Sequence, residues 1–297
     1  MITKFIESNG VQLFTVQRGQ KDGPLVIMLH GFPEFWYGWH HQVDALTEAG
    51  FNVWTPDMRG YNLSEKPKGT EAYALDELAK DVAGLIDASG HQKAILIGHD
   101  WGAAVAWWVA NKFPEKLEKL IILNVPHPRV MVKALNEDWA QRRRSWYMFY
   151  FQIPTLPEIG MRFNNWHYMA KAMQDSARPN TFSDSDMAQY RKAWGQPGAI
   201  TAMLNYYRAI FRHRPASSSS QRIQTPTLII WGAQDAFIGR EYAEESLAMC
   251  DSGKLVILEE ATHWVQHEEP ARVNELILEF LNHPQSVITQ GAAESLP

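Results

Sequence analysis

The sequence has little of several features that would place it in a specialised class of proteins. It holds one cysteine, Cys250, in 297 residues, which excludes an internal disulfide framework and suits a reducing compartment. The net charge is −5 and the only basic run, Arg142-Arg143-Arg144, is interpreted as a solvated helix face, so no nucleic-acid partner is expected. No stretch approaches the ~18 apolar residues of a membrane span, and the N-terminal segment is polar. We therefore expect a cytoplasmic protein without stable membrane insertion.

What the sequence does contain is the composition of a globular protein with an aromatic cavity. Hydrophobic residues make up 45% of the chain and charged residues 21%, which is ample material for a core. The 12 tryptophans and 10 tyrosines gather partly in the middle third. This clustering predicts an apolar cavity lined by aromatic rings, with ordinary core packing as the alternative. The sequence leaves a monomer and a homodimer open.

The order of apolar patterns along the chain indicates an α/β core with an insertion. Short apolar runs alternate with segments of helical period up to about residue 125, which predicts a mostly parallel central sheet flanked by helices. Strand patterns then stop, and stretches such as Asp138–Phe151 and Ile200–Arg212 have helical spacing. The strand patterns resume after the predicted linker Ser217–Ser220. We predict a core formed by residues 1–125 and 221–297, a helical cap at 126–220, and a frayed tail from about 283.

The most specific motif is Gly98-His99-Asp100-Trp101-Gly102, which follows an apolar run. Its two glycines allow a tight strand–turn–helix elbow around Asp100. Such elbows usually present serine, but serine attack at saturated carbon would leave an ether that water cannot readily cleave. A carboxylate is ionised near pH 7, and its attack leaves an alkyl ester that activated water can open. Asp100 therefore indicates epoxide opening or carbon–halogen cleavage, the alternative being an ordinary turn aspartate that caps a helix.

Two later residues supply the partners that such a nucleophile needs. Asp235 and His263 each follow a predicted strand, which gives the chain order nucleophile, acid, histidine. The carboxyl ends of parallel strands meet at one edge of a sheet, so we expect all three side chains to converge there. His263 would activate water for ester hydrolysis, and Asp235 would orient His263.

Other residues near these strand ends are weaker candidates or have supporting roles. His30, His99 and His267 are less suitable as the base, and Asn124 is a neutral residue at a second position where the acid can sit. Asp57 also follows a strand, but a turn-stabilising role suits it better. The backbone N–H groups of Phe32 and Trp101 are predicted to form an oxyanion hole.

The leaving group distinguishes the two possible reactions. An epoxide oxygen leaves as a strongly basic alkoxide unless an acid donates a proton or hydrogen bond to it, whereas a halide needs only weak N–H donors. Residues 146–152 and 204–208 form two tyrosine-rich segments. Tyrosine hydroxyls stay protonated at neutral pH and are suitable donors.

Four motifs together resemble those of the α/β-hydrolase epoxide hydrolases, with soluble epoxide hydrolase the nearest likeness. They are HGFPEFWYGW at 30–39, DMRGY at 57–61, GHDWG at 98–102 and NYYR at 205–208, and the likeness runs from about residue 20 to 282. The resemblance implies Asp100 as nucleophile, His263 as base, Asp235 as its partner, and Tyr147 and Tyr207 as donors to the ring oxygen. Tyr150 lies one turn from Tyr147 and is the alternative second donor.

The resemblance also predicts the surroundings of the reacting atoms. Phe32, Pro33, Trp101 and Tyr150 are expected to contact a small-molecule epoxide. No ligand cluster or phosphate loop suggests a metal or organic cofactor. Asn62 stands where the family commonly has glycine, and we expect the turn to survive because asparagine tolerates the left-handed conformation.

Two other functions compete with epoxide hydrolysis. Haloalkane dehalogenases share the elbow, and Trp101 matches their halide-holding tryptophan, but Phe32 stands where they often have asparagine. A fluoroacetate dehalogenase would typically have arginine after the nucleophile, and Trp101 is not one. The third possibility is a hydrolase-fold protein that binds a ligand without turnover. The favoured reaction is conversion of an epoxide to a vicinal diol through an ester on Asp100.

Overall fold

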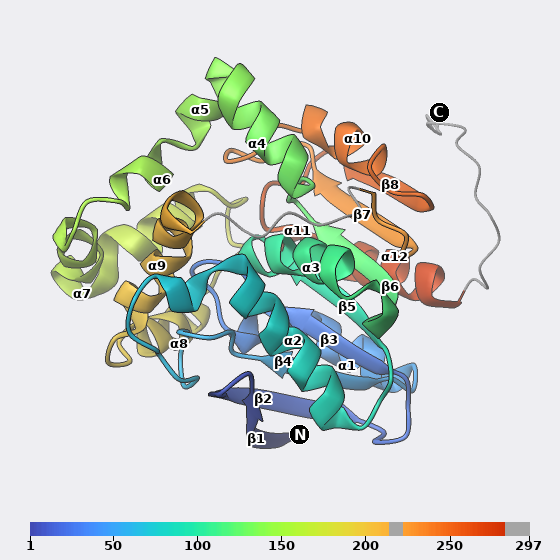
Figure 1. The fold of residues 1–297 in the computed structure, drawn as a ribbon. Coiled ribbons are helices and arrows are strands. Elements are labelled where there is room, and N and C mark those ends of the chain that lie inside the picture. The colour runs from blue at the N-terminus through green and yellow to red at the C-terminus, as the bar shows by residue number, and fades with distance from the viewer. Residues whose placement is uncertain (214–221, 283–297) are drawn as a thin grey trace.

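A computed structural model describes residues 1–213 and 222–282 and contains one eight-stranded sheet (Figure 1). The strand order is β1-β2-β4-β3-β5-β6-β7-β8, with β1 and β2 forming an antiparallel hairpin and β2 antiparallel to β4. The remaining pairings are parallel, which confirms the predicted mostly parallel sheet. The strands are β1 (Ile2–Ser8), β2 (Val11–Gly19), β3 (Leu25–Leu29), β4 (Asn52–Pro56), β5 (Ala94–His99), β6 (Leu117–Leu123), β7 (Thr227–Gly232) and β8 (Gly253–Leu258).

Helices cover both faces of the sheet, so the central strands β3 and β5 are buried at every position rather than at alternate ones. Leu78 and Val82 from one face and Val43 and Leu276 from the other belong to two separate apolar core clusters. The connecting helices are η1 (Trp36–Trp39), α1 (His40–Glu48), η2 (Glu71–Tyr73), α2 (Leu75–Ser89), α3 (Trp101–Lys112), η3 (Pro114–Lys116), α10 (Glu241–Leu247), α11 (Val265–Glu268) and α12 (Pro270–Asn282). None of the helices in the described ranges combines the length and apolarity needed to cross a bilayer.

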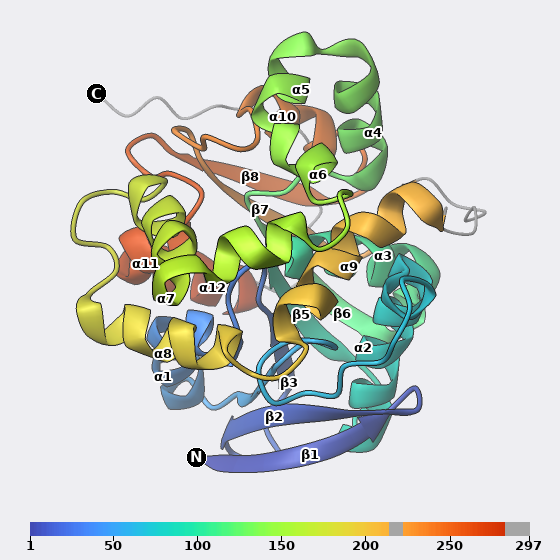
Figure 2. The ribbon, with the colours of Figure 1, turned by 90° about the vertical axis from the view of Figure 1, so that its left-hand side faces the viewer.

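Between β6 and β7 the described part of the chain contains helices and no strand, and these helices gather at one side of the sheet (Figures 1 and 2). They are α4 (Pro128–Glu137), α5 (Trp139–Arg144), α6 (Trp146–Tyr150), α7 (Leu156–Asp175), α8 (Asp184–Trp194) and α9 (Ala199–Arg212). The predicted helical stretch Ile200–Arg212 is confirmed as α9. The predicted linker Ser217–Ser220 and the tail from 283 lie outside the described residues.

The stretch Asp138–Phe151, whose spacing predicts helix, contains two helices that are separated at Ser145 rather than one. Ser145 is buried, and its hydroxyl accepts a hydrogen bond from Gln141 Nε2 at 2.9 Å. The same amide nitrogen donates to the carbonyl of Phe237 at 2.8 Å. The break is therefore tied to the loop after β7, which overrides the helical period of the sequence.

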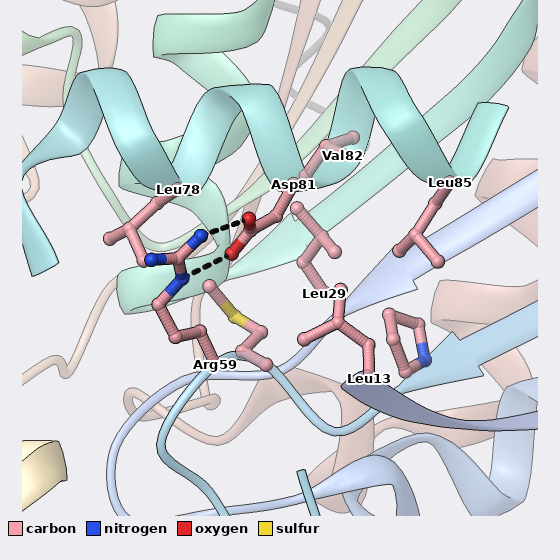
Figure 3. A pocket seen from close by; sticks show the side chains of 9 residues that line it. Leu13, Leu29, Arg59, Leu78, Asp81, Val82 and Leu85 are labelled. Carbon is pink, nitrogen blue, oxygen red and sulfur yellow. Dashed lines mark hydrogen bonds and ion pairs between the residues drawn. The ribbon is translucent and has the colours of Figure 1, made fainter. Parts of the chain in front are cut away.

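A buried ion pair fixes the loop after β4 beneath α2 (Figure 3). Arg59 Nε donates to Asp81 Oδ2 at 2.7 Å, Arg59 Nη2 pairs with Asp81 Oδ1, and leucine side chains surround the two groups. The carbonyl oxygen of Arg59 accepts a hydrogen bond from the Tyr206 hydroxyl at 2.7 Å. The DMRGY loop thus holds α9 in place, and the residue after Tyr206 faces the candidate site.

Candidate active site

The elbow presents Asp100 in a conformation that few residues adopt. Asp100 has φ +48° and ψ −122°, and α3 begins at the next residue. The turn is so tight that a Cβ on Gly102 would lie 2.0 Å from the carbonyl oxygen of Leu29, and one on Gly31 would lie 2.2 Å from Asp100 Cβ. Only glycine fits either position without moving the backbone. The strained turn thus holds the Asp100 carboxylate at the carboxyl end of β5.

The structure brings the three predicted reacting residues together at the carboxyl edge of the sheet. Asp100 follows β5, Asp235 follows β7 and His263 follows β8. His263 Nδ1 lies 2.7 Å from Asp235 Oδ2, and its Nε2 lies 3.7 Å from Asp100 Oδ2. The imidazole is 3% exposed, so it is held between two carboxylates in a site nearly closed to solvent. This arrangement can orient a histidine with one nitrogen and use the other for proton transfer.

The charges of this cluster support one another. Burial disfavours the imidazolium, but the carboxylates of Asp235 and Asp100 outweigh it and raise the pKa of His263 to about 10. Burial likewise disfavours the Asp235 anion, and the His263 charge outweighs it and lowers the pKa of Asp235. Before reaction, the histidine is therefore protonated near neutral pH between two carboxylates.

One predicted oxyanion-hole donor already contacts the nucleophile. The backbone N–H of Phe32 donates to Asp100 Oδ1 at 2.5 Å. Trp101 is the first residue of α3, so the intrahelical hydrogen bonds of that helix do not use its N–H. The Phe32 N–H therefore lies where it can stabilise negative charge on a carboxyl oxygen of residue 100, and the helix leaves the Trp101 N–H available for the same role.

The predicted aromatic cavity adjoins these residues. Its volume is about 600 Å³, and both Asp100 and His263 line it. Among the described residues, its walls include the predicted contacts Phe32, Pro33, Tyr147, Tyr150 and Tyr207, as well as Arg143, Arg144, Trp146, Phe151, Met169, Met173, Phe237 and Trp264. Trp101 is not among the cavity-lining residues, because its 5% exposed ring packs edge-on against Tyr206 and Tyr207. This geometry therefore does not support the expected contact between Trp101 and the substrate through its ring.

Two tyrosines of the cavity lie within electrostatic reach of Asp100. Tyr147 on α6 and Tyr207 on α9 have ring centroids 5.9 Å apart at an interplanar angle of 81°. Burial, reinforced by the Asp100 charge, raises the pKa of each hydroxyl far above its ordinary value, so both stay protonated. The Tyr150 hydroxyl instead lies beside α7, where a Cβ on Gly160 would lie 3.3 Å from it.

The chain matches the alpha/beta hydrolase fold family over residues 24–270. The chain belongs to this family. It is 47% identical to the AB hydrolase superfamily protein YfhM of Bacillus subtilis (strain 168), over 94% of this chain and 98% of that protein. It is also 38% identical to Epoxide hydrolase 1 of Caenorhabditis elegans, over 95% of this chain and 71% of that protein.

A solved structure agrees with this assignment. The crystal structure of the Bacillus megaterium epoxide hydrolase in complex with an inhibitor matches this hydrolase with a TM-score of 0.87. The two chains are 34% identical, and the match covers 94% of this chain and 100% of that one. The epoxide-hydrolase resemblance drawn from the motifs is therefore confirmed at the level of sequence relatives and of fold.

This α/β hydrolase uses Asn124 to hold the carboxylate of Asp235. Asn124 Nδ2 donates to Asp235 Oδ2 at 2.8 Å, and its Oδ1 accepts from the backbone N–H of Gly232 at 3.0 Å. The position after β6 therefore carries a residue that orients the acid rather than the acid itself. The sequence indicated the location of Asn124 but not this role, because no pattern in the sequence shows that the residue after β6 contacts the loop after β7.

A second feature missed by sequence reasoning is the buried carboxylate of Glu34. It accepts hydrogen bonds from the Tyr190 hydroxyl at 2.7 Å and from Gln266 Nε2 at 3.1 Å, and lies 2.7 Å from His267 Nε2. Burial disfavours the Glu34 anion, but His267 and His99 outweigh it and hold the pKa of Glu34 well below its usual range. The only signal for Glu34 was its place within the HGFPE motif.

The remaining histidines near the site are structural. His99 Nε2 donates to the carbonyl of His263 at 2.8 Å, so it supports the backbone of the predicted base. His30 Nε2 accepts from the backbone N–H of Met58 at 2.9 Å, and burial lowers the pKa of His30 to about 4. Both therefore have roles that fit their weaker ranking as the catalytic base.

The turn accommodates Asn62, which stands where the family commonly has glycine, as predicted. Asn62 has φ +38°, and its Nδ2 donates to Asp57 Oδ2 at 2.8 Å. Asp57 also accepts from the backbone N–H of Trp36 at 3.0 Å, which ties this turn to η1. These contacts fit the turn-stabilising role expected for Asp57.

Proposed function

We propose that this hydrolase converts an epoxide and water to a vicinal diol through an alkyl ester on Asp100. The observation that carries the proposal is the placement of two protonated tyrosines, the partly buried Tyr147 and the buried Tyr207, in the same cavity as the carboxylate. Related proteins named as epoxide hydrolases agree with it. A halide would not need such donors, because it leaves as a stable anion.

In the first step, Asp100 Oδ2 attacks a ring carbon, and the carbon–oxygen bond of the ring breaks. The electron pair goes to the ring oxygen, to which Tyr147 and Tyr207 donate hydrogen bonds or a proton. The contact between the Phe32 N–H and Oδ1 leaves Oδ2, on the side of His263, as the attacking atom. Tyr147 is preferred over Tyr150 because the Asp100 charge acts on its hydroxyl, while that of Tyr150 lies beside Gly160.

Ring opening leaves a base, the tyrosinate or product alkoxide, to which the His263 imidazolium passes its proton once the ester has removed the Asp100 charge. In the second step, the neutral His263 accepts a proton from water, and the resulting hydroxide adds to the carbonyl carbon of the ester. Asp235 holds Nδ1 of the imidazole, so Nε2 faces the reacting water. The N–H groups of Phe32 and Trp101 stabilise the oxyanion that forms on residue 100. Collapse of this intermediate breaks the ester, and the leaving oxygen takes the proton from His263 as the diol is released. The carboxyl group of residue 100 then returns a proton to His263, which restores the starting state.

We propose that residues 126–220 act as a cap that completes the substrate cavity. Both donor tyrosines come from this segment, whereas Asp100 and His263 come from the sheet edge. The aromatic and methionine side chains of the walls favour an epoxide with an apolar substituent of considerable size. A polar, very small epoxide would leave most of the cavity uncontacted.

The reaction is tested by offering one preparation a panel of epoxides and, separately, 1-bromobutane. We expect diol from styrene oxide or a bulkier aryl epoxide and no bromide release. Bromide release without diol would show a dehalogenase, and ligand binding with neither product would show a non-catalytic protein. Asp100→Ala should abolish diol formation, and robust turnover by that variant would refute the nucleophile assignment.

The ester itself is tested with His263→Gln, which retains the nucleophile but lacks the base. Mass spectrometry of this variant after incubation with styrene oxide should find one adduct of the epoxide's mass, on the peptide that contains Asp100. An adduct elsewhere, or none in a variant that binds the substrate, would contradict a two-step mechanism through this residue.

A further inference from the structure

Three histidines outside the cavity come together where α1 meets α11. His40 and His41 are the first residues of α1, and His267 lies in α11. One ring nitrogen from each lies within 4.8 Å of those of the other two. The rings of His40 and His41 have centroids 3.8 Å apart, and that of His267 lies 5.8 Å from the first and 6.1 Å from the second.

Hydrogen bonds already orient two of these rings. His40 Nδ1 donates to the carbonyl of Tyr37 at 2.8 Å, which leaves Nε2 as the nitrogen with a lone pair. His267 Nε2 faces the Glu34 carboxylate at 2.7 Å, which leaves Nδ1 for another partner. A ring nitrogen bound to a carbonyl or carboxylate is the arrangement that orients histidines in metal centres and increases the basicity of the other nitrogen.

The third ring can adjust to complete the site. Tetrahedral zinc with Zn–N distances of about 2.0–2.1 Å requires nitrogens about 3.3 Å apart, so separations that lie within 4.8 Å need to shrink by at most about 1.5 Å. His41 is exposed and can rotate toward the others, whereas the hydrogen bonds above fix His40 and His267.

Two acidic groups face the cluster. They are Asp186, which accepts a hydrogen bond from Tyr37, and Glu34, which lies against His267. Their negative charge favours a bound cation.

We propose that His40, His41 and His267 form a binding site for one divalent transition metal of the class that prefers imidazole, such as Zn²⁺. Hard cations such as Mg²⁺ prefer oxygen ligands and should not bind there. The site lies outside the cavity of Asp100, since none of the three histidines lines it. It therefore does not depend on the proposed reaction.

The test is a titration of tag-free, chelator-treated full-length protein with Zn²⁺ against a competing chromophoric chelator. A tag-free chain is needed because the sequence has 11 histidines of its own and a polyhistidine tag would add a stronger site. We expect one Zn²⁺ per chain, with no displacement by excess Mg²⁺. His41→Ala should weaken binding at least about tenfold, and it removes an exposed side chain with little effect on packing.

Two further variants keep the outcome decisive. His267→Gln retains a donor toward Glu34 but lacks the imidazole, so it should also weaken binding at least about tenfold. His167→Ala removes an exposed histidine in α7 and should bind Zn²⁺ like the wild type. Thermal melts would show that each variant is folded. Substoichiometric binding by the wild type, or equal affinities for all three variants, would overturn the proposal.

Discussion

Neutralising Asp100 should convert His263 from a resting cation into a base. The Asp100→Asn variant keeps the size of the side chain but removes its charge, as formation of the ester does during the proposed reaction. In the wild type, the carboxylates of Asp235 and Asp100 raise the pKa of His263 to about 10 against the opposing effect of burial. With one carboxylate gone, we expect this pKa to fall toward neutrality.

The separation of the two groups sets the size of the effect. His263 Nε2 and Asp100 Oδ2 are 3.7 Å apart, and opposite unit charges at that distance attract by about 4.5 kcal/mol at an effective dielectric constant of about 20. One pKa unit corresponds to about 1.4 kcal/mol, so the loss lowers the pKa by about 3. The expected value for Asp100→Asn is therefore about 7. Below that pH the imidazole is protonated and cannot accept a proton from water.

The assay is a histidine NMR titration of wild type and Asp100→Asn between pH 5.5 and 10.5, with the resonance assigned through His263→Gln. Asp87→Asn is the control, because it removes an equal charge from a side chain that is 65% exposed. In single turnovers of the wild type, ester hydrolysis should then accelerate with pH through an inflection near 7. A His263 pKa within about 1 of the wild-type value in Asp100→Asn would refute the reasoning.

Three further outcomes follow from individual contacts. Tyr147→Phe and Tyr207→Phe should each slow ester formation by about 10²-fold or more in stopped-flow measurements, and an unaffected double variant would exclude these donors. Asn124→Ala removes the acceptor of the buried Gly232 N–H and one donor to the buried Asp235 carboxylate, so the free energy of unfolding in urea should fall by about 1–3 kcal/mol, and an unchanged value would contradict its proposed role. Arg59→Met leaves the buried Asp81 carboxylate without its ion-pair partner, so the free energy of unfolding should fall by about 3–5 kcal/mol at pH 8. Because burial raises the pKa of Asp81 to about 6 even beside Arg59, protonation should make that loss smaller at pH 5, and equal losses at both pH values would contradict the pairing.

The fold and the convergence of Asp100, Asp235 and His263 could be predicted because they depend on local patterns. Buried parallel strands are continuous apolar runs, and the residues that follow them lie at one edge of the sheet whatever the loop lengths. Asp100, Asp235 and His263 were therefore identifiable from their positions after strands. The hairpin of β1 and β2 was equally local, since Asn9 and Gly10 both adopt positive φ at its turn.

Contacts between distant segments could not be predicted in this way. The break at Ser145 depends on a hydrogen bond from Gln141, which is itself bound to the loop after β7. The Glu34 cluster joins residues separated by up to 233 positions, and no periodicity in the chain indicates which of them meet. The ring of Trp101 was expected at the substrate, but α9 covers it, and only the packing of that helix decides its position.

The charge of Asp100 links the two half-reactions more closely than the triad geometry alone suggests. While it is present, it raises the pKa of both Tyr147 and Tyr207, so the donors are protonated when the ring opens. The same charge keeps His263 protonated, so no base is available to activate water too early. In the proposed reaction, formation of the ester would remove this charge and lower the pKa of His263, so the base would be produced when an ester exists to be hydrolysed. The order of the steps thus follows from one carboxylate lying 3.7 Å from the imidazole.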